Sequence, residues 1–235
     1  MAKEKMKLPV VFLPGLMCDS RLFHPQINTL SGEITIILSP VSGFNSVTEI
    51  ATNILSIMPN RFALAGLSFG GIVALEMIRI APERILKMAL MDTSYSSEST
   101  YIADKRAAQI LAVQTGKLEE VMMQEHLPNY LADGSTSGPI SDLCITMAKQ
   151  LGKEVFIQQS RALISRIDQT VTLQNIDVPT MILCGAYDRL CNVQTHQNMA
   201  NLIKGSSFKI VPDAGHLPTL ENPTTTNRIL SEWLN

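Results

Sequence analysis

Gly66-Leu67-Ser68-Phe69-Gly70-Gly71 places one serine between glycines that lie two residues before it and two residues after it. The apolar run Phe62-Ala63-Leu64-Ala65 precedes this stretch, and an amphipathic segment over residues 72–80 follows it. The pattern is G-x-S-x-G at a strand-to-helix junction, which holds the serine on a sharp turn. A Cβ at either glycine is expected to collide with the neighbouring strand and helix, and the helix N-terminus offers free N–H groups to a developing anion. We therefore interpret Ser68 as a candidate nucleophile.

The composition is that of one sizeable globular domain. The chain has 235 residues, of which 46% are hydrophobic and 17% are charged, so a large core is expected and a disordered chain is excluded. The formal net charge of −2 provides no basic field, so we expect no nucleic-acid partner. No apolar segment is long enough to cross a bilayer, so we expect no membrane span.

The first 17 residues superficially resemble an export signal, because a basic start at 1–7 is followed by an apolar run at 8–17. Pro9, Pro14 and Gly15 interrupt that run, which favours a first core strand with its loop. The cysteines show no C-x-x-C spacing, so we expect neither a zinc site nor any other metal. Without an export signal, the cysteines are expected to be reduced thiols in a cytoplasmic protein. They are Cys18, Cys144, Cys184 and Cys191.

Apolar runs and helical patterns alternate along most of the chain. The runs predict strands at 8–13, 34–38, 62–67, 87–91, 180–184 and 208–211. Between them, a capping box at Ser46–Glu49 begins a helix that ends before Pro59, and further helices are expected at 193–203 and after Asn222. This alternation predicts an α/β fold with a mostly parallel central sheet of about six strands and helices on both faces.

One long region interrupts the alternation. Residues 94–175 contain no convincing strand, and helical patterns occur at 101–113, 140–151 and 155–167. We interpret 95–175 as an inserted helical cap, or lid, over the carboxyl edge of the sheet, with 1–94 and 176–235 forming the core domain. The alternative is a set of additional core helices at the side of the sheet.

A serine nucleophile requires a base, and the chain has four histidines. His24 precedes the serine, His126 belongs to the proposed insertion, and His196 lies on a helix of the surface type. His216 lies in the loop Pro212–Pro218 directly after the last predicted strand. That loop can place an imidazole over the turn that carries Ser68, so we assign His216 as the candidate base.

The residue that orients the base is expected to be an acid at the end of the preceding strand. Asp188 follows the run 180–184 and the turn at Gly185. The candidates then occur in the order serine, acid, histidine, which is the order known in the fold class that carries this G-x-S-x-G turn. Asp92, at the end of the fourth predicted strand, is an alternative acid. Asp213 shares a loop with His216 and is interpreted as a turn residue.

The reaction also needs two N–H donors that stabilise an oxyanion. One is expected to be the backbone amide of Phe69, the residue after the nucleophile. The second is expected from the loop 14–17 after the first strand, and the backbone amide of Leu16 is the candidate. Only the backbone of this residue is needed, so its side chain carries no sequence signal.

Four motifs together resemble the α/β-hydrolase superfamily over essentially the whole chain: residues 13–16, 66–71, 184–188 and 214–218. The chain is similar to small capped bacterial carboxylesterases of the pimeloyl-carrier-protein methyl esterase type. The resemblance implies an α/β-hydrolase fold and a serine hydrolase that cleaves a small-molecule carboxylic ester through an acyl-enzyme, without a cofactor. Relatives often have His-Gly where this chain has Pro14-Gly15, so the support of the oxyanion loop must differ.

Two other functions are compatible with the same residues. One is a C–C bond hydrolase or lyase that uses the same triad, and the other is a catalytically inert ligand receptor. Substrate identity and oligomeric state are left open. We interpret Arg106, Arg161 and Arg166 as solvated charges, with recognition of an acidic substrate as the alternative. We likewise interpret methionines 122, 123 and 147 as helix-packing residues, with a pliable acyl pocket as the alternative.

Overall fold

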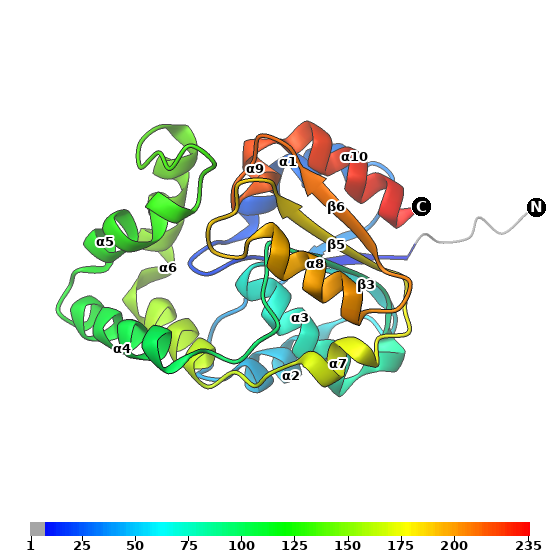
Figure 1. Ribbon diagram of the computed structural model, residues 1–235, viewed down its shortest axis with the longest axis horizontal. Coiled ribbons are helices and arrows are strands. Elements are labelled where there is room, and N and C mark those ends of the chain that lie inside the picture. The colour runs from blue at the N-terminus through cyan, green and yellow to red at the C-terminus, as the bar shows by residue number, and fades with distance from the viewer. Residues whose placement is uncertain (1–7) are drawn as a thin grey trace, which may run out of the picture.

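The computed structural model describes residues 8–235, so the basic start of the chain at 1–7 lies outside the described residues (Figure 1). One six-stranded sheet has the order β2-β1-β3-β4-β5-β6, and every neighbouring pair is parallel. The predicted α/β fold with a parallel sheet is thereby confirmed. The strands are β1 (Val10–Leu13), β2 (Ile36–Leu38), β3 (Phe62–Leu67), β4 (Ile85–Met91), β5 (Thr180–Gly185) and β6 (Ser207–Val211).

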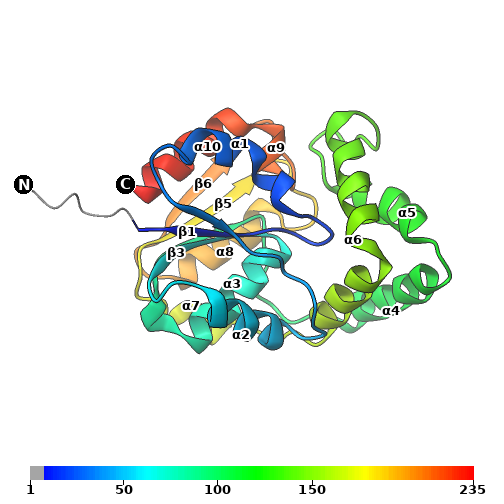
Figure 2. The same ribbon diagram turned by 180° about the vertical axis from the view of Figure 1, so that it is seen from behind.

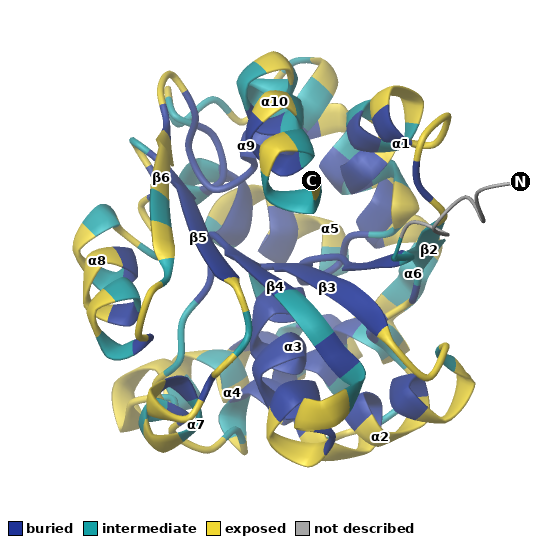
Figure 3. Cartoon of the chain, turned by 90° about the vertical axis from the view of Figure 1, so that its right-hand side faces the viewer, coloured by how far each residue is buried: buried dark blue, intermediate teal, exposed yellow. Residues whose placement is uncertain are grey.

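The central strands are apolar along their whole length because helices cover both of their faces. Every residue of β1, β3 and β5 is buried, whereas the edge strands β2 and β6 are more exposed (Figure 3). Each buried large aliphatic side chain contributes about 1.5–3 kcal/mol to folding. The carboxyl ends of the parallel strands meet at one edge of this rigid sheet, and the loops that follow β1, β3, β4, β5 and β6 gather there.

Two helical layers enclose the sheet (Figures 1 and 2). One layer contains α1 (His24–Leu30), α9 (Pro218–Glu221) and α10 (Pro223–Leu234), and the other contains α2 (Val47–Ile57), α3 (Phe69–Ile80), α7 (Thr170–Gln174) and α8 (Val193–Leu202). Short 3-10 turns, η1 (Ser20–Phe23) and η2 (Pro82–Arg84), precede α1 and β4. Ser46 caps α2 as predicted, since its hydroxyl accepts the Glu49 N–H, and the Glu49 carboxylate accepts from that hydroxyl. Asn222 caps α10 in the same way.

A further group of helices stands beside the carboxyl edge of the sheet (Figures 1 and 2). It contains α4 (Thr100–Gln114), α5 (Leu118–Val121), a π-helical turn η3 (Met122–His126), a 3-10 turn η4 (Leu127–Asn129) and α6 (Pro139–Ile164). Gly152, between the helical patterns predicted at 140–151 and 155–167, has a φ of 84° and kinks α6, which then continues to Ile164. By contrast, α7 packs against α3 and α8 in the layer beside the sheet.

No helix within residues 8–235 is both long and apolar enough to cross a membrane. The four cysteines are free thiols.

Candidate active site

Ser68 occupies a strained turn between β3 and α3, with φ 54° and ψ −117°. A Cβ on Gly66 would lie 2.3 Å from the carbonyl oxygen of Gly70, and a Cβ on Gly70 would lie 2.1 Å from the carbonyl oxygen of Leu13 in β1. Both separations are far shorter than any real contact, so this turn requires glycine at both positions, as the sequence predicts. The Thr93 hydroxyl donates a hydrogen bond of 2.7 Å to the Ser68 carbonyl and anchors the turn from the end of β4.

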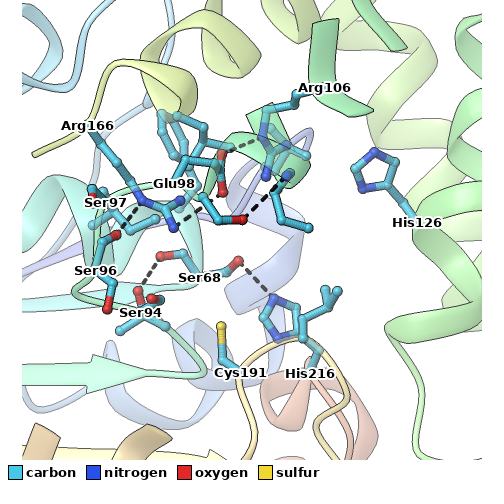
Figure 4. Close-up of a pocket in the computed structure, with 18 of the residues that line it drawn as sticks. Ser68, Ser94, Ser96, Ser97, Glu98, Arg106, His126, Arg166, Cys191 and His216 are labelled. Atoms are coloured by element: carbon cyan, nitrogen blue, oxygen red, sulfur yellow. Dashed lines mark hydrogen bonds and ion pairs between the residues drawn. The ribbon is translucent and has the colours of Figure 1, made fainter. Parts of the chain in front are cut away.

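The structure brings the three predicted triad residues together (Figure 4 shows Ser68 and His216). His216 Nε2 lies 2.8 Å from Ser68 Oγ, and His216 Nδ1 lies 2.9 Å from Asp188 Oδ2. The other carboxylate oxygen of Asp188 accepts the backbone N–H groups of Leu190 and Cys191, at 2.8 and 3.0 Å. Burial tends to raise the pKa of Asp188, but the neighbouring His216 and these N–H donors outweigh it and hold the pKa below its usual range.

This arrangement can transfer a proton from a hydroxyl. An ionised Asp188 accepts a hydrogen bond from Nδ1–H of His216, which leaves the lone pair on Nε2 directed at the Ser68 hydroxyl. Ser68 then donates to Nε2, the geometry in which an imidazole acts as a general base.

Asp92, the alternative acid, has a different environment. It is fully buried, and its Oδ1 accepts the Gly185 N–H at 2.8 Å, whereas the His216 ring bonds to Asp188. Burial, together with the charge of Asp188, raises the pKa of Asp92 well above its usual range, the opposite of the shift at Asp188. Asp213 adopts a left-handed φ of 55° in the turn before His216, in keeping with a turn residue.

The predicted oxyanion donors lie beside the serine. Leu16 and Phe69 line the same cavity as Ser68, and a Cβ on Gly15 would lie 3.4 Å from the Ser68 Cβ. Within residues 8–235, the backbone N–H groups of Leu16 and Phe69 have no hydrogen-bond acceptor. Two unpaired donors on adjacent backbone segments are what an oxyanion would engage.

The support of the oxyanion loop comes from a residue that the sequence analysis did not identify. Gln159 on α6 is buried, and its Oε1 accepts the Met17 N–H at 3.0 Å while its Nε2 donates to the Val41 carbonyl at 3.0 Å. Met17 has a φ of 52°, an unfavourable conformation for a side chain of this size. The Asp19 N–H also lies 3.4 Å from the sulfur of Met147 on α6. A helix far along the chain therefore supports the loop that bears Pro14-Gly15, and no local signal marks that contact.

Glu221 has a corresponding role for the histidine loop and was also missed. Its carboxylate accepts the backbone N–H groups on either side of His216, those of Gly215 at 2.9 Å and Leu217 at 3.1 Å. It also accepts the N–H of Ala132, at 2.7 Å, from the helical region 95–175. Burial raises the pKa of Glu221, and the three N–H donors oppose that effect. Glu221 therefore connects two loops that enclose the imidazole.

His196 does not have the exposed environment that a surface-type helix suggests. It is fully buried, its Nε2 accepts the Thr93 N–H at 3.0 Å, and its Nδ1 bonds to the Asn192 carbonyl at 3.0 Å. The ring must be neutral to accept one bond and donate the other, and burial lowers its pKa accordingly. His196 thus supports the end of β4 next to Ser68, whereas His24 is exposed at the start of α1.

A cavity of about 380 Å³ opens above Ser68. Part of its wall is apolar, formed by Leu16, Phe69, Ile72, Ile102, Leu163 and Leu190. The three cap methionines are absent from the lining, so they do not form an acyl pocket in this cavity. Arg106 and Arg166 line it with side chains only 15% and 11% exposed, so the interpretation of these two as solvated charges is wrong. Arg161 is exposed, as expected.

One group of residues in the described part of the chain has atoms close enough to ligate a metal ion. Asp188, Cys191 and His216 place one potential ligand atom each within 4.8 Å of one another. Asp188 and His216 are already bonded to each other, and burial and the charge of Asp188 raise the pKa of the Cys191 thiol well above its usual range. A metal would have to displace the Asp188–His216 hydrogen bond and ionise this thiol.

Known proteins resemble this chain over most of its length. Residues 10–229 match the profile of a family described as "Alpha/beta hydrolase family". A putative 2-succinyl-6-hydroxy-2,4-cyclohexadiene-1-carboxylate synthase of Bacillus subtilis (strain 168) is 27% identical, over 95% of this chain and 84% of the relative. A pimeloyl-[acyl-carrier protein] methyl ester esterase of Legionella pneumophila (strain Paris) is 23% identical, over 99% and 97%. A thermophilic esterase from Thermogutta terrifontis superposes with a TM-score of 0.88 at 24% identity, covering 97% of this chain and 89% of that one.

Proposed function

Because the chain belongs to the alpha/beta hydrolase family, we propose that it is a serine hydrolase that cleaves a carboxylic ester through a Ser68–His216–Asp188 triad. The observation that carries the proposal is the continuous hydrogen-bond chain from the Ser68 hydroxyl through both nitrogens of His216 to Asp188. The esterases among its relatives support the same reaction class.

Each residue of the site has a defined role in this mechanism. His216 takes the proton of Ser68 as the Ser68 oxygen attacks the ester carbonyl, and then passes that proton to the departing alcohol. The N–H groups of Leu16 and Phe69 hold the oxyanion, and loss of one such donor costs about 3 kcal/mol of transition-state stabilisation. Asp188 stabilises the imidazolium. Water, activated by His216, then cleaves the acyl-enzyme and releases the acid.

Residues 95–175 act as the cap in this proposal. Residues of this region that line the cavity above Ser68 include Ile102, Arg106, His126, Tyr130, Leu163 and Arg166. A substrate bound to Ser68 would therefore contact the cap with much of its surface. The core, in this division, comprises residues 1–94 and 176–235.

The test is the Ser68→Ala variant with short p-nitrophenyl esters as substrates. Turnover should fall to background while the circular dichroism spectrum and the thermal midpoint stay close to those of the native protein. Ser94→Ala is the matched control, because Ser94 lines the same cavity without bonding to the triad. A fluorophosphonate should label the native protein at Ser68. Unchanged turnover in Ser68→Ala would refute the assignment, and an inert receptor would not be labelled.

A second candidate is a C–C bond hydrolase or lyase that uses the same triad. It is favoured by the 27% identity to a protein named as a carboxylate synthase. Turnover of a vinylogous diketone or of an eliminating substrate, with no turnover of any ester, would select this candidate. Fluorophosphonate labelling of Ser68 is expected in either case, so the substrate series distinguishes the two.

A further inference from the structure

Two arginines and one glutamate meet in the wall of the cavity above Ser68 (Figure 4). Arg106 Nε on α4 lies 2.7 Å from one carboxylate oxygen of Glu98, and an Nη of Arg166, just after α6, lies 3.4 Å from the other. Glu98 itself belongs to the loop between β4 and α4. The Glu98 side chain is 5% exposed, so the cluster is shielded from bulk water except through the cavity.

The cluster carries one excess positive charge. Of the other acids near the cavity, Glu125 pairs with Lys105 at 3.6 Å. Asp188 does not line the cavity, and its carboxylate accepts hydrogen bonds from His216, Leu190 and Cys191. A buried charge without a counterion is unfavourable by several kcal/mol. Such a charge beside a cavity therefore indicates that a bound anion completes the pairing.

Hydrogen-bond donors remain available to receive that anion. Arg106 uses Nε for Glu98, and its two terminal nitrogens have no acceptor within residues 8–235. Arg166 uses Nε for the Ser96 carbonyl, at 2.8 Å, and one terminal nitrogen for Glu98. Its other terminal nitrogen has no acceptor in the same part of the chain. Guanidinium groups present such donors as a planar fork that matches a carboxylate.

His126, on the same cavity, responds to this positive field. Burial, followed by the charge of Arg106, lowers its pKa to about 3, so the ring is neutral at physiological pH. The neutral His126 ring therefore adds no charge, and the cluster keeps one excess positive charge. A monoanion would neutralise the cluster of Arg106, Arg166 and Glu98, whereas a phosphate dianion would leave one buried negative charge.

We propose that Arg106 and Arg166 form a carboxylate-binding subsite, and that the enzyme prefers esters which carry a free carboxylate at the end remote from the scissile bond. The apolar wall of Ile72, Ile102 and Leu163 suits the methylene chain between the two groups. This inference rests on the proposed ester hydrolysis and names its substrate class.

The first experiment compares matched esters on the native protein. Monoethyl esters of succinate, glutarate, adipate, pimelate and suberate are tested against ethyl hexanoate, with ethanol release as the readout. At least one monoethyl ester should have a kcat/KM about 10- to 100-fold above that of ethyl hexanoate, the range expected for a charge-assisted hydrogen bond. Equal or higher kcat/KM for ethyl hexanoate against the whole series would overturn the proposal.

Substitutions then test which residues cause the preference for esters with a free carboxylate. Arg106→Gln and Arg166→Gln should each lower kcat/KM for the preferred monoethyl ester far more than kcat/KM for ethyl hexanoate, and so remove most of the preference. Arg161→Gln is the matched control, because the Arg161 side chain is exposed and, within residues 8–235, bonds only to Asn45, at 3.4 Å. Glu98→Gln should keep or increase the preference, since it removes a competing anion. An equal loss for both substrates in the arginine variants and in Glu98→Gln would indicate a purely structural cluster and refute the subsite.

A binding measurement separates this proposal from the proposed function. Adipate is titrated calorimetrically into Ser68→Ala and into the double variant with Arg106→Gln. Binding that is lost with Arg106→Gln supports the subsite even if no tested ester is turned over, and no binding to Ser68→Ala refutes it. Failure of fluorophosphonate to label Ser68 would count against the hydrolase mechanism alone.

Discussion

The substitution Gln159→Leu tests whether a helix of the cap region holds the oxyanion hole in place. The change keeps a side chain of similar volume but removes both hydrogen bonds, the one from Met17 N–H and the one to the Val41 carbonyl. Each buried polar group left unpaired costs about 1–3 kcal/mol. Met17 also loses the contact that holds its left-handed backbone, a conformation that costs about 1–2 kcal/mol.

We expect the loop 14–17 to shift and so relieve this strain. The shift would move the Leu16 N–H away from the oxyanion. Because one such donor is worth about 3 kcal/mol, complete loss would lower kcat by about 100-fold, and partial loss by about 10-fold. KM should change less than about threefold, since Gln159 does not line the cavity above Ser68. Steady-state kinetics with p-nitrophenyl butyrate measure both constants.

The neighbouring glutamine supplies the control. Gln158 is half-buried and accepts the Gly43 N–H at 3.1 Å in a solvent-exposed hydrogen bond, so Gln158→Leu should leave kcat unchanged. Gln159→Glu should be intermediate, because a carboxylate can still accept from Met17 but cannot donate to Val41. A folded Gln159→Leu protein with a kcat within threefold of the native value would refute the reasoning.

Three further predictions concern other parts of the site. Glu221→Ala should lower kcat about 10-fold, because the N–H groups around His216 lose their acceptor, and Glu221→Gln should recover part of the loss in the same kinetic assay. Gly70→Ala should destabilise the fold by at least about 1–3 kcal/mol, because the added Cβ would collide with the Leu13 carbonyl. Gly32→Ala is the control and should change the urea midpoint little, because no atom lies within 4 Å of its Cβ. His126 has a pKa of about 3 in the folded protein, against an ordinary value near 6.5. As the pH falls, the unfolded chain therefore binds a proton before the folded protein does. The free energy of unfolding should decrease below about pH 6.5, by up to about 1.4 kcal/mol per pH unit. His126→Phe should therefore narrow the difference between urea midpoints at pH 7 and pH 5, and an unchanged difference would contradict this assignment.

The sheet, and the meeting of Ser68, His216 and Asp188 at its edge, could be predicted because their signals are local. Apolar runs mark buried parallel strands, and the glycines around Ser68 reflect contacts of the backbone with itself. Asp188 and His216 were found because each follows directly on a strand and the carboxyl ends of parallel strands meet at one edge.

The supporting residues could not be predicted, because their partners are distant in sequence and chemically ordinary. Gln159 accepts a hydrogen bond from a backbone N–H 142 residues away in the sequence, and no periodic pattern in the sequence marks that contact. Arg106 on the polar helix α4 and Arg166 just after α6 resemble solvated charges in the sequence, but the fold brings both of them to Glu98 in the cavity wall. The burial of His196 likewise depends on the packing of α8 against β5 and β6.

The hydrogen bond from the Met17 N–H to Gln159, together with the contact of the Asp19 N–H with Met147, has a consequence for the engineering of this protein. Exchanging residues 95–175 for the equivalent segment of a relative would be an obvious route to a new substrate range. Such a graft would also discard the supports of the loop 14–17, so the hybrid would inherit a slower reaction along with its new pocket. A successful exchange would have to carry a glutamine at the position of Gln159, or restore a loop that supports itself.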